Sequence, residues 1–80
     1  METRVAALAI VVENTESVEK LNAILHDYAD QIIGRMGVPY RDRGMNVITV
    51  AVDAEQDKIS AMAGKIGALD GVTVSTALSK

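Results

Sequence analysis

The 80-residue chain contains no cysteine, tryptophan or phenylalanine. The absence of cysteine excludes a disulfide, a thiolate metal site and a thiol nucleophile. The aromatic side chains are limited to Tyr28 and Tyr40, so a hydrophobic core would be built mainly from Ala, Val, Ile, Leu and Met. A single domain this small buries only a small hydrophobic core, and association with another copy would therefore stabilise it.

Long apolar runs and an excess of basic charge are also absent. No run approaches the length of a membrane span, and no basic segment leads into a cleavable apolar one, so we expect a cytoplasmic protein without a membrane partner. The formal net charge of −3 argues against nucleic-acid binding through the whole surface, and we expect no direct nucleic-acid contact.

No catalytic pair is recognisable in the sequence. His26 is the single histidine and would be the only imidazole base available to a serine nucleophile. His26 and Asp30 have helical spacing, but a metal site needs three or four ligands. Gly64-Lys65 lacks the hydroxyl residue and the spacing of a phosphate-binding loop. We therefore expect no enzymatic activity, no cofactor and no bound metal.

Hydrophobic periodicity predicts the order strand, helix, strand, strand, helix, strand. The first and third predicted strands are apolar on both faces, which is typical of central strands. The last one alternates between apolar and small polar residues, as edge strands do. The predicted strands are 4–13, 31–38, 45–53 and 72–78, and the predicted helices are 16–29 and 54–69.

Local signals mark the ends of both helices. Asn14 is positioned to cap the first helix, and Asp53 with Gln56 has the spacing of a capping box for the second. Gly64 and Gly67 lower the helix propensity of the second helix, and close packing against a neighbouring element would explain them.

The element order is that of the α+β ferredoxin-like fold, βαββαβ, with a four-stranded antiparallel sheet and two helices on one face. The other face, lined by aliphatic residues of the two central strands, would be open to water in a monomer. Exposed patches of this kind mark interfaces. We therefore predict a homo-oligomer, a dimer or tetramer, that covers the open sheet face.

The most distinctive stretch is 34–44, which joins the second and third strands. It holds three of the six glycines, the only proline and three of the eight Lys and Arg residues. Two glycines inside a strand let another backbone approach, and Pro39 is expected to end the strand before a turn at 40–44. We predict that this hairpin belongs to the association surface.

The hairpin also supplies most of the candidate ligand-binding residues. Its arginines could present guanidinium forks to a carboxylate, a phosphate or an acidic partner, and its glycines could offer backbone donors. The alternative is a solvated hairpin whose arginines pair with Asp42 or a neighbouring subunit. Tyr40 could stack on a ligand or anchor an interface, and Glu13-Asn14 could face a pocket or simply end a strand. The candidates are Arg35, Arg41, Arg43, Tyr40, Gly34, Gly37, Glu13 and Asn14.

Three segments carry a family resemblance: Ala-Ile-Val-Val-Glu-Asn at 9–14, Val-Glu-Lys-Leu-Asn at 18–22, and Ile-Ile-Gly-Arg-Met-Gly-Val-Pro-Tyr-Arg-Asp-Arg-Gly at 32–44. Over essentially its whole length the chain resembles a small bacterial family of regulators of the iron-only hydrogenase system. The resemblance implies a stand-alone ACT-like domain, similar in shape to the ligand-binding domain of the nickel-responsive transcription regulator. It also implies a regulatory or sensing role linked to hydrogenase maturation.

Two departures limit what carries over from these wider relatives. Nickel-responsive regulators bind metal through several histidines and a cysteine and carry a DNA-binding module, neither of which fits this chain. Amino-acid-binding ACT domains place a glycine after the first strand, where this chain has none at 14–17.

We therefore expect a homo-oligomeric regulator with a small-molecule effector between subunits. The alternatives are an interaction module that docks on a hydrogenase maturation protein and a small ferredoxin-like enzyme.

Overall fold

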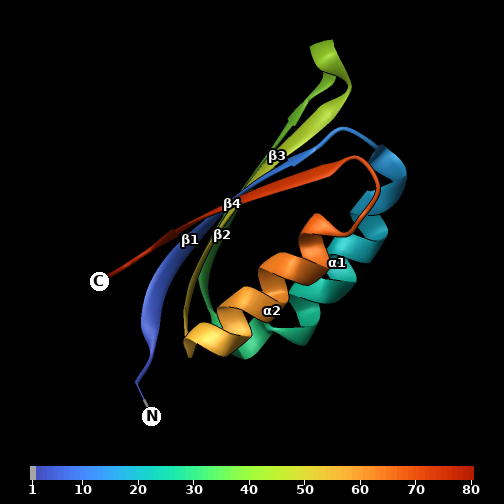
Figure 1. The fold of residues 1–80 in the computed structure, drawn as a ribbon. Coiled ribbons are helices and arrows are strands. Elements are labelled where there is room, and N and C mark those ends of the chain that lie inside the picture. The colour runs from blue at the N-terminus through green and yellow to red at the C-terminus, as the bar shows by residue number, and fades with distance from the viewer. Residues whose placement is uncertain (1) are drawn as a thin grey trace.

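A computed structural model describes residues 2–80 and shows four strands and two helices (Figure 1). All strand pairs are antiparallel, and the strand order is β2-β3-β1-β4. The ferredoxin-like prediction is therefore confirmed, with β1 and β3 at the centre of the sheet. The elements are β1 (Arg4–Val12), α1 (Val18–Asp27), β2 (Ile32–Tyr40), β3 (Met45–Ala54), α2 (Gln56–Gly67) and β4 (Val72–Leu78).

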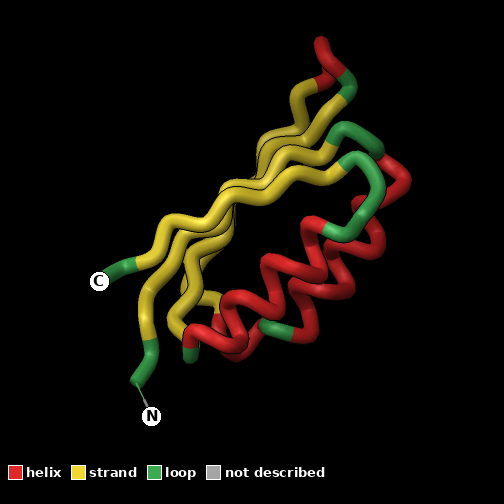
Figure 2. The backbone as a smooth tube through the Cα atoms, viewed as in Figure 1, coloured by secondary structure: helices red, strands yellow, loops and turns green. Residues whose placement is uncertain are grey.

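Both helices lie on one side of the sheet, and the core fills the space between the two layers (Figure 2). Alternate residues of β1 and β3 point into this core because side chains in a strand alternate between faces. Full burial of one aliphatic side chain contributes about 1.5–3 kcal/mol, so the core between the sheet and the helices supplies most of the stability. The largest fully buried side chains are Leu8, Ile10, Val12, Leu21, Leu25, Val50, Val52, Met62 and Ile66.

Strand β2 is longer than the sequence predicts. Its ladder with β3 continues through Pro39, which pairs with Asn46, and ends at Tyr40. The prediction that Pro39 ends the strand is therefore wrong. Because β2 is an edge strand, a residue without an N–H is tolerated when that side faces away from β3. The turn is reduced to a 3-10 segment, Arg41–Arg43, which Gly44 ends with a φ of 62°.

A register shift interrupts the regular alternation of β2 near its start. Even-numbered residues 32–38 would share one face of a regular strand. Ile32 instead pairs with the buried Val52, whereas Gly34 pairs with Ala51 on the other face of β3. The shift inserts an extra residue between them, as in a β-bulge. Ile32 thus packs against the core, and Gly34 lies on the face away from the helices.

Asn14 caps the 3-10 turn that precedes α1 rather than α1 itself, whose N-cap position is held by Ser17 without a side-chain cap bond, and the predicted cap of the second helix is wrong. The Asn14 side chain accepts a hydrogen bond from the Glu16 N–H, but a 3-10 turn precedes α1 and shortens the helix. At α2, Glu55 occupies the N-cap position without a side-chain hydrogen bond. Asp53 cannot cap this helix because β3 continues to Ala54, which pairs with Arg4. Within residues 2–80, neither helix is long and apolar enough to cross a membrane.

The two helix glycines have different explanations. At Gly67 an added Cβ would lie 3.2 Å from the Val74 Cγ1, so close packing against β4 accounts for this glycine. At Gly64 no atom lies within 4 Å of an added Cβ, and the packing explanation is wrong there.

Candidate functional site

The side of the sheet that faces away from the helices is not covered by any element of residues 2–80 (Figure 2). Its larger apolar side chains are well exposed, at 64% for Met36, 48% for Val5 and 39% for Val47. No charged residue belongs to its centre. We call this surface the open face, and it is formed by alternate residues of all four strands: Val5, Ala7, Ala9, Val11, Met36, Val38, Val47, Thr49, Ala51, Thr73, Ser75 and Ala77.

A shallow hollow lies on the open face above Gly34. It has a volume of about 270 Å³, and Gly34, Arg35, Met36, Thr49 and Ala51 line it. The hollow exists because Gly34 has no side chain, and an added Cβ would have no neighbour within 4 Å. Met36 stands beside it as the most exposed large apolar side chain of the chain's described residues.

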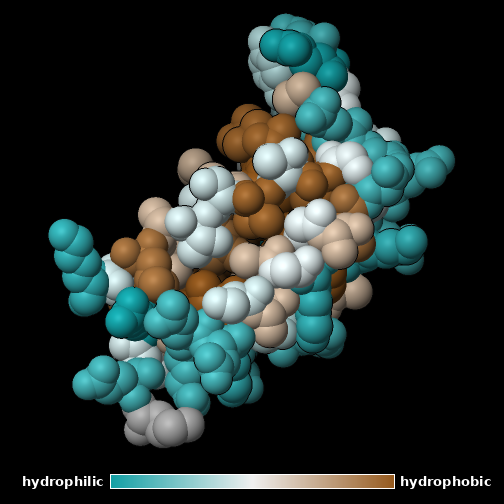
Figure 3. Space-filling model, viewed as in Figure 1, coloured by the Kyte–Doolittle hydropathy of each residue, from teal (hydrophilic) through white to brown (hydrophobic). Residues whose placement is uncertain are grey.

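The tip of the β2–β3 hairpin projects beyond the helices, and the whole molecule is 42 Å long (Figure 1). Figure 3 shows hydrophilic side chains at this tip and hydrophobic ones over the strands beneath it. Arg41 and Arg43 lie in the tip and are exposed. Tyr40, which is 47% exposed, lies where the tip joins β2, on the same side of the strand as Gly34.

Arg35 lies apart from the other two arginines. It pairs with the buried Val50 and therefore points to the helix side of the sheet, where its Nη2 donates a hydrogen bond to the Asn22 Oδ1 at 3.3 Å. Six residues of extended strand separate it from Arg41, which corresponds to about 20 Å. Within one subunit, the three arginines thus do not converge on one site.

A groove of about 230 Å³ opens beside Arg35, between α1 and the β2–β3 hairpin. Gly37, the second candidate glycine, lines the same groove, whereas Gly34 lies on the opposite face. The sequence could not reveal this groove, because Asn22 and Asn46, which also line it, come from separate elements.

Glu13 and Asn14 lie at the end of β1 against the α2–β4 turn. The Asn14 Nδ2 donates to the Asp70 Oδ2 at 2.8 Å while its Oδ1 accepts from the Glu16 N–H at 3.0 Å. The Glu13 N–H donates to the Gly71 carbonyl at 2.7 Å. Both ends of the Asn14 amide are therefore occupied, and its role in this subunit is to join two loops.

Ser17 extends this loop junction and was not singled out by the sequence. Its hydroxyl donates to the Asp70 carbonyl oxygen at 2.6 Å, and the residue is only 4% exposed. The sequence signal was the Asp70-Gly71 turn, whose backbone must meet the start of the first helix.

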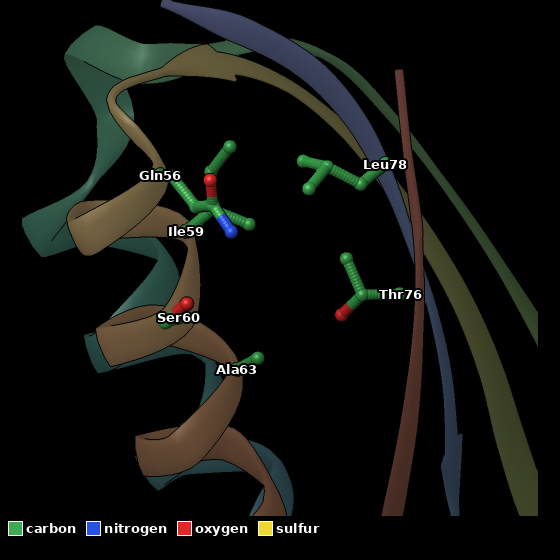
Figure 4. A pocket seen from close by; sticks show the side chains of 6 residues that line it. All are labelled: Gln56, Ile59, Ser60, Ala63, Thr76 and Leu78. Atoms are coloured by element: carbon green, nitrogen blue, oxygen red, sulfur yellow. The ribbon is translucent and has the colours of Figure 1, made fainter. Parts of the chain in front are cut away.

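A second groove, of about 250 Å³, separates α2 from the edge strand β4. Figure 4 shows Thr76 and Leu78 pointing from the strand toward the helix, which presents Gln56 and Ser60. All the residues that line it are uncharged, so it could accept a neutral group but offers no ionic selectivity.

Two further features of residues 2–80 are the placement of potential metal ligands and the pairing of buried polar side-chain atoms. No group of three or more His, Cys, Asp or Glu side chains is placed to hold a metal ion. Every buried side-chain nitrogen or oxygen atom in this part of the chain has a hydrogen-bond partner. The features available for function are the open face, the hairpin tip and the grooves.

These features define a small ferredoxin-like domain with one uncovered sheet face. A family model described as "Iron-only hydrogenase system regulator, putative" matches residues 4–76, and the chain belongs to this TM1266-like family. The structure of the uncharacterized protein TM1266 from Thermotoga maritima is similar, with a TM-score of 0.94 and 34% identity over 99% of this chain and 100% of that chain. No curated protein matches the chain. Membership of this family supports a regulatory role.

Proposed function

We propose that this chain is a non-catalytic regulatory domain of the iron-only hydrogenase system that acts as a homo-oligomer. The open face packs on the open face of a second copy, and a small ligand binds at the boundary between subunits. The family supports the regulatory part of this proposal. The observation that carries the oligomer is the uncovered apolar face, which would be costly to leave in water.

The open face is large enough for a specific interface with a second copy. Four strands spaced by about 4.8 Å, each with about nine residues of about 3.3 Å, present about 570 Å². Two stacked faces would bury about 1,100 Å² in total, above the roughly 1,000 Å² expected of a specific interface.

The shape of the open face favours a second copy over an unrelated partner. A protruding side chain, Met36, stands next to a hollow above Gly34 on the same surface. In a two-fold arrangement the same patch meets itself, so each Met36 can enter the hollow of the other subunit. No charge lies at the centre of the open face, and Asp53 pairs with Val5 at its rim, so stacking two copies buries no charge at the centre of the interface.

The hairpin tip offers the groups that a ligand at this boundary would need. Tyr40 and Gly34 lie on the association side of β2, and Arg41 and Arg43 extend beyond the helices. A guanidinium pair next to a phenol ring suits an anionic ligand with a planar or apolar part.

A matched pair of charge substitutions tests the association. Ala9→Asp places a carboxylate at the centre of the open face, and Ala61→Asp makes the same change on the exposed surface of α2. Light scattering at several micromolar concentrations should give an oligomer for the wild type and for Ala61→Asp. Ala9→Asp should be a folded monomer, because an unpaired charge cannot be buried without a large desolvation cost.

A wild-type chain that stays monomeric at these concentrations would overturn the oligomer. A thermal-shift screen with amino acids, nucleotides and divalent metals tests the sensing part. A ligand-specific shift supports a sensor, and the absence of any shift supports the alternative of a module that docks on a maturation protein. Turnover of any compound would replace both with the small ferredoxin-like enzyme.

A further inference from the structure

We infer that the groove between α1 and the β2–β3 hairpin, the Arg35 groove, binds a small monocarboxylate in each subunit. The inference goes beyond the proposed function, because the groove lies on the helix side of the sheet and is formed by one chain alone. Its walls combine one guanidinium, two amides and an apolar floor. The lining residues that determine what the groove can bind are Val18, Asn22, Arg35, Gly37, Asn46 and Ile48.

The charge of the groove selects a single negative charge. Arg35 is the only charged residue among those that line it, although the chain as a whole carries a formal charge of −3. A guanidinium has five N–H groups, and the long bond to Asn22 uses one of them. The remaining donors can form the two parallel hydrogen bonds that a carboxylate accepts. A doubly charged phosphate would lack a second cation.

The other walls limit the size and shape of the ligand. The amide groups of Asn22 and Asn46 offer additional donors and acceptors next to Arg35, and the aliphatic side chains of Val18 and Ile48 form the floor. A volume of about 230 Å³ equals that of about eight water molecules. A carboxylate with a short branched or unbranched aliphatic chain fits both the space and the floor.

Gly37 keeps the groove open and provides a clean test. An added Cβ would lie 3.9 Å from the Ile48 Cγ1, an ordinary contact, so alanine fits while its methyl group occupies part of the groove. Gly34 on the same strand also has room for a Cβ, but on the opposite face. The two glycine-to-alanine variants thus add the same methyl group to one strand and differ in the face on which it lies.

The test is a two-dimensional NMR titration with butyrate and isobutyrate, with the isosteric butyramide and isobutyramide as neutral controls and inorganic phosphate as a dianionic control. At least one carboxylate should produce saturable amide shifts around residues 22, 35–37 and 46, and the carboxamides and phosphate should not. Arg35→Gln should weaken binding by about tenfold or more, since a charged hydrogen-bond donor is lost. Arg4→Gln, an exposed position at the start of β1 that does not line the groove, should bind like the wild type.

Gly37→Ala should also weaken binding several-fold, whereas Gly34→Ala should leave it unchanged. The inference is overturned if neither carboxylate gives saturable shifts at the groove, or if Arg35→Gln binds as the wild type does. Repeating the titration with Ala9→Asp separates this inference from the proposed oligomer. Equal affinity is expected there, and a loss of binding in that folded variant would show that the site needs a second subunit.

Discussion

At Gly71 a single missing side chain allows two loops to meet. The residue has a φ of 68°, and an added Cβ would lie 2.6 Å from the Asn14 Cβ and 2.9 Å from its backbone nitrogen. The neighbouring atoms make three hydrogen bonds between the β1–α1 and α2–β4 connections. This junction holds the β1–α1 connection against the α2–β4 connection. Its geometry therefore affects how the sheet and both helices are joined.

Gly71→Ala is therefore expected to destabilise the domain far more than Gly44→Ala. Both glycines are left-handed, at 68° and 62°, but Gly44 has no atom within 4 Å of an added Cβ. The shared conformational cost is about 1 kcal/mol, and the clash with Asn14 should raise the cost at Gly71 to about 3 kcal/mol. Urea denaturation of both variants measures the difference, and equal losses would contradict the role of the junction.

At the scale of single residues, the sequence predicted which residues could bind a ligand better than it predicted where they lie in the fold. The three arginines were recognisable as a concentration of cations, but they divide between the helix side of the sheet and the hairpin tip. Strand periodicity alone cannot tell which face of β2 meets the helices, because an edge strand with two glycines has little hydrophobic contrast. Asn14 was predicted to cap the first helix and instead caps the 3-10 turn before it, and its bond to Asp70 depends on a contact distant in sequence.

Among the elements, β4 was predicted with the bounds that it has, and β1 to within one residue. Their alternating and continuous apolar patterns are strong signals. The ends of β2 and α2 were wrong because pairing to a neighbour decided them. The partner strand β3 extends β2 past Pro39, and β1 holds Ala54 in β3, which moves the start of α2.

The two glycines of α2 give a prediction at this scale. Gly64→Ala should stabilise the domain by about 0.5–1 kcal/mol, because alanine has the higher helix propensity and its Cβ meets no other atom. Gly67→Ala gains the same propensity but places its Cβ 3.2 Å from the Val74 side chain, so it should gain less or lose stability. Thermal unfolding of the two variants, with the wild type as reference, checks the order. A larger gain for Gly67→Ala would contradict the packing of α2 on β4.

At the scale of the whole molecule, the topology could be predicted because two strands were apolar on both faces and two were not. That pattern places β1 and β3 at the centre and leaves one face of the sheet uncovered, as the structure shows. The grooves could not be predicted, because each combines side chains of elements that are far apart in the sequence. The oligomer that we propose to cover the open face stays a prediction.

Oxidation of Met36 measures most directly whether a second copy covers the open face, on which this side chain is 64% exposed. Met62, which is 1% exposed, is the internal control. The rate of methionine oxidation by hydrogen peroxide follows solvent access, and peptide mass spectrometry resolves each site. If a second copy covers the open face, Met36 should oxidise several-fold more slowly in the wild type than in Ala9→Asp, while Met62 stays slow in both. Equally rapid oxidation of Met36 in the two proteins would contradict the account.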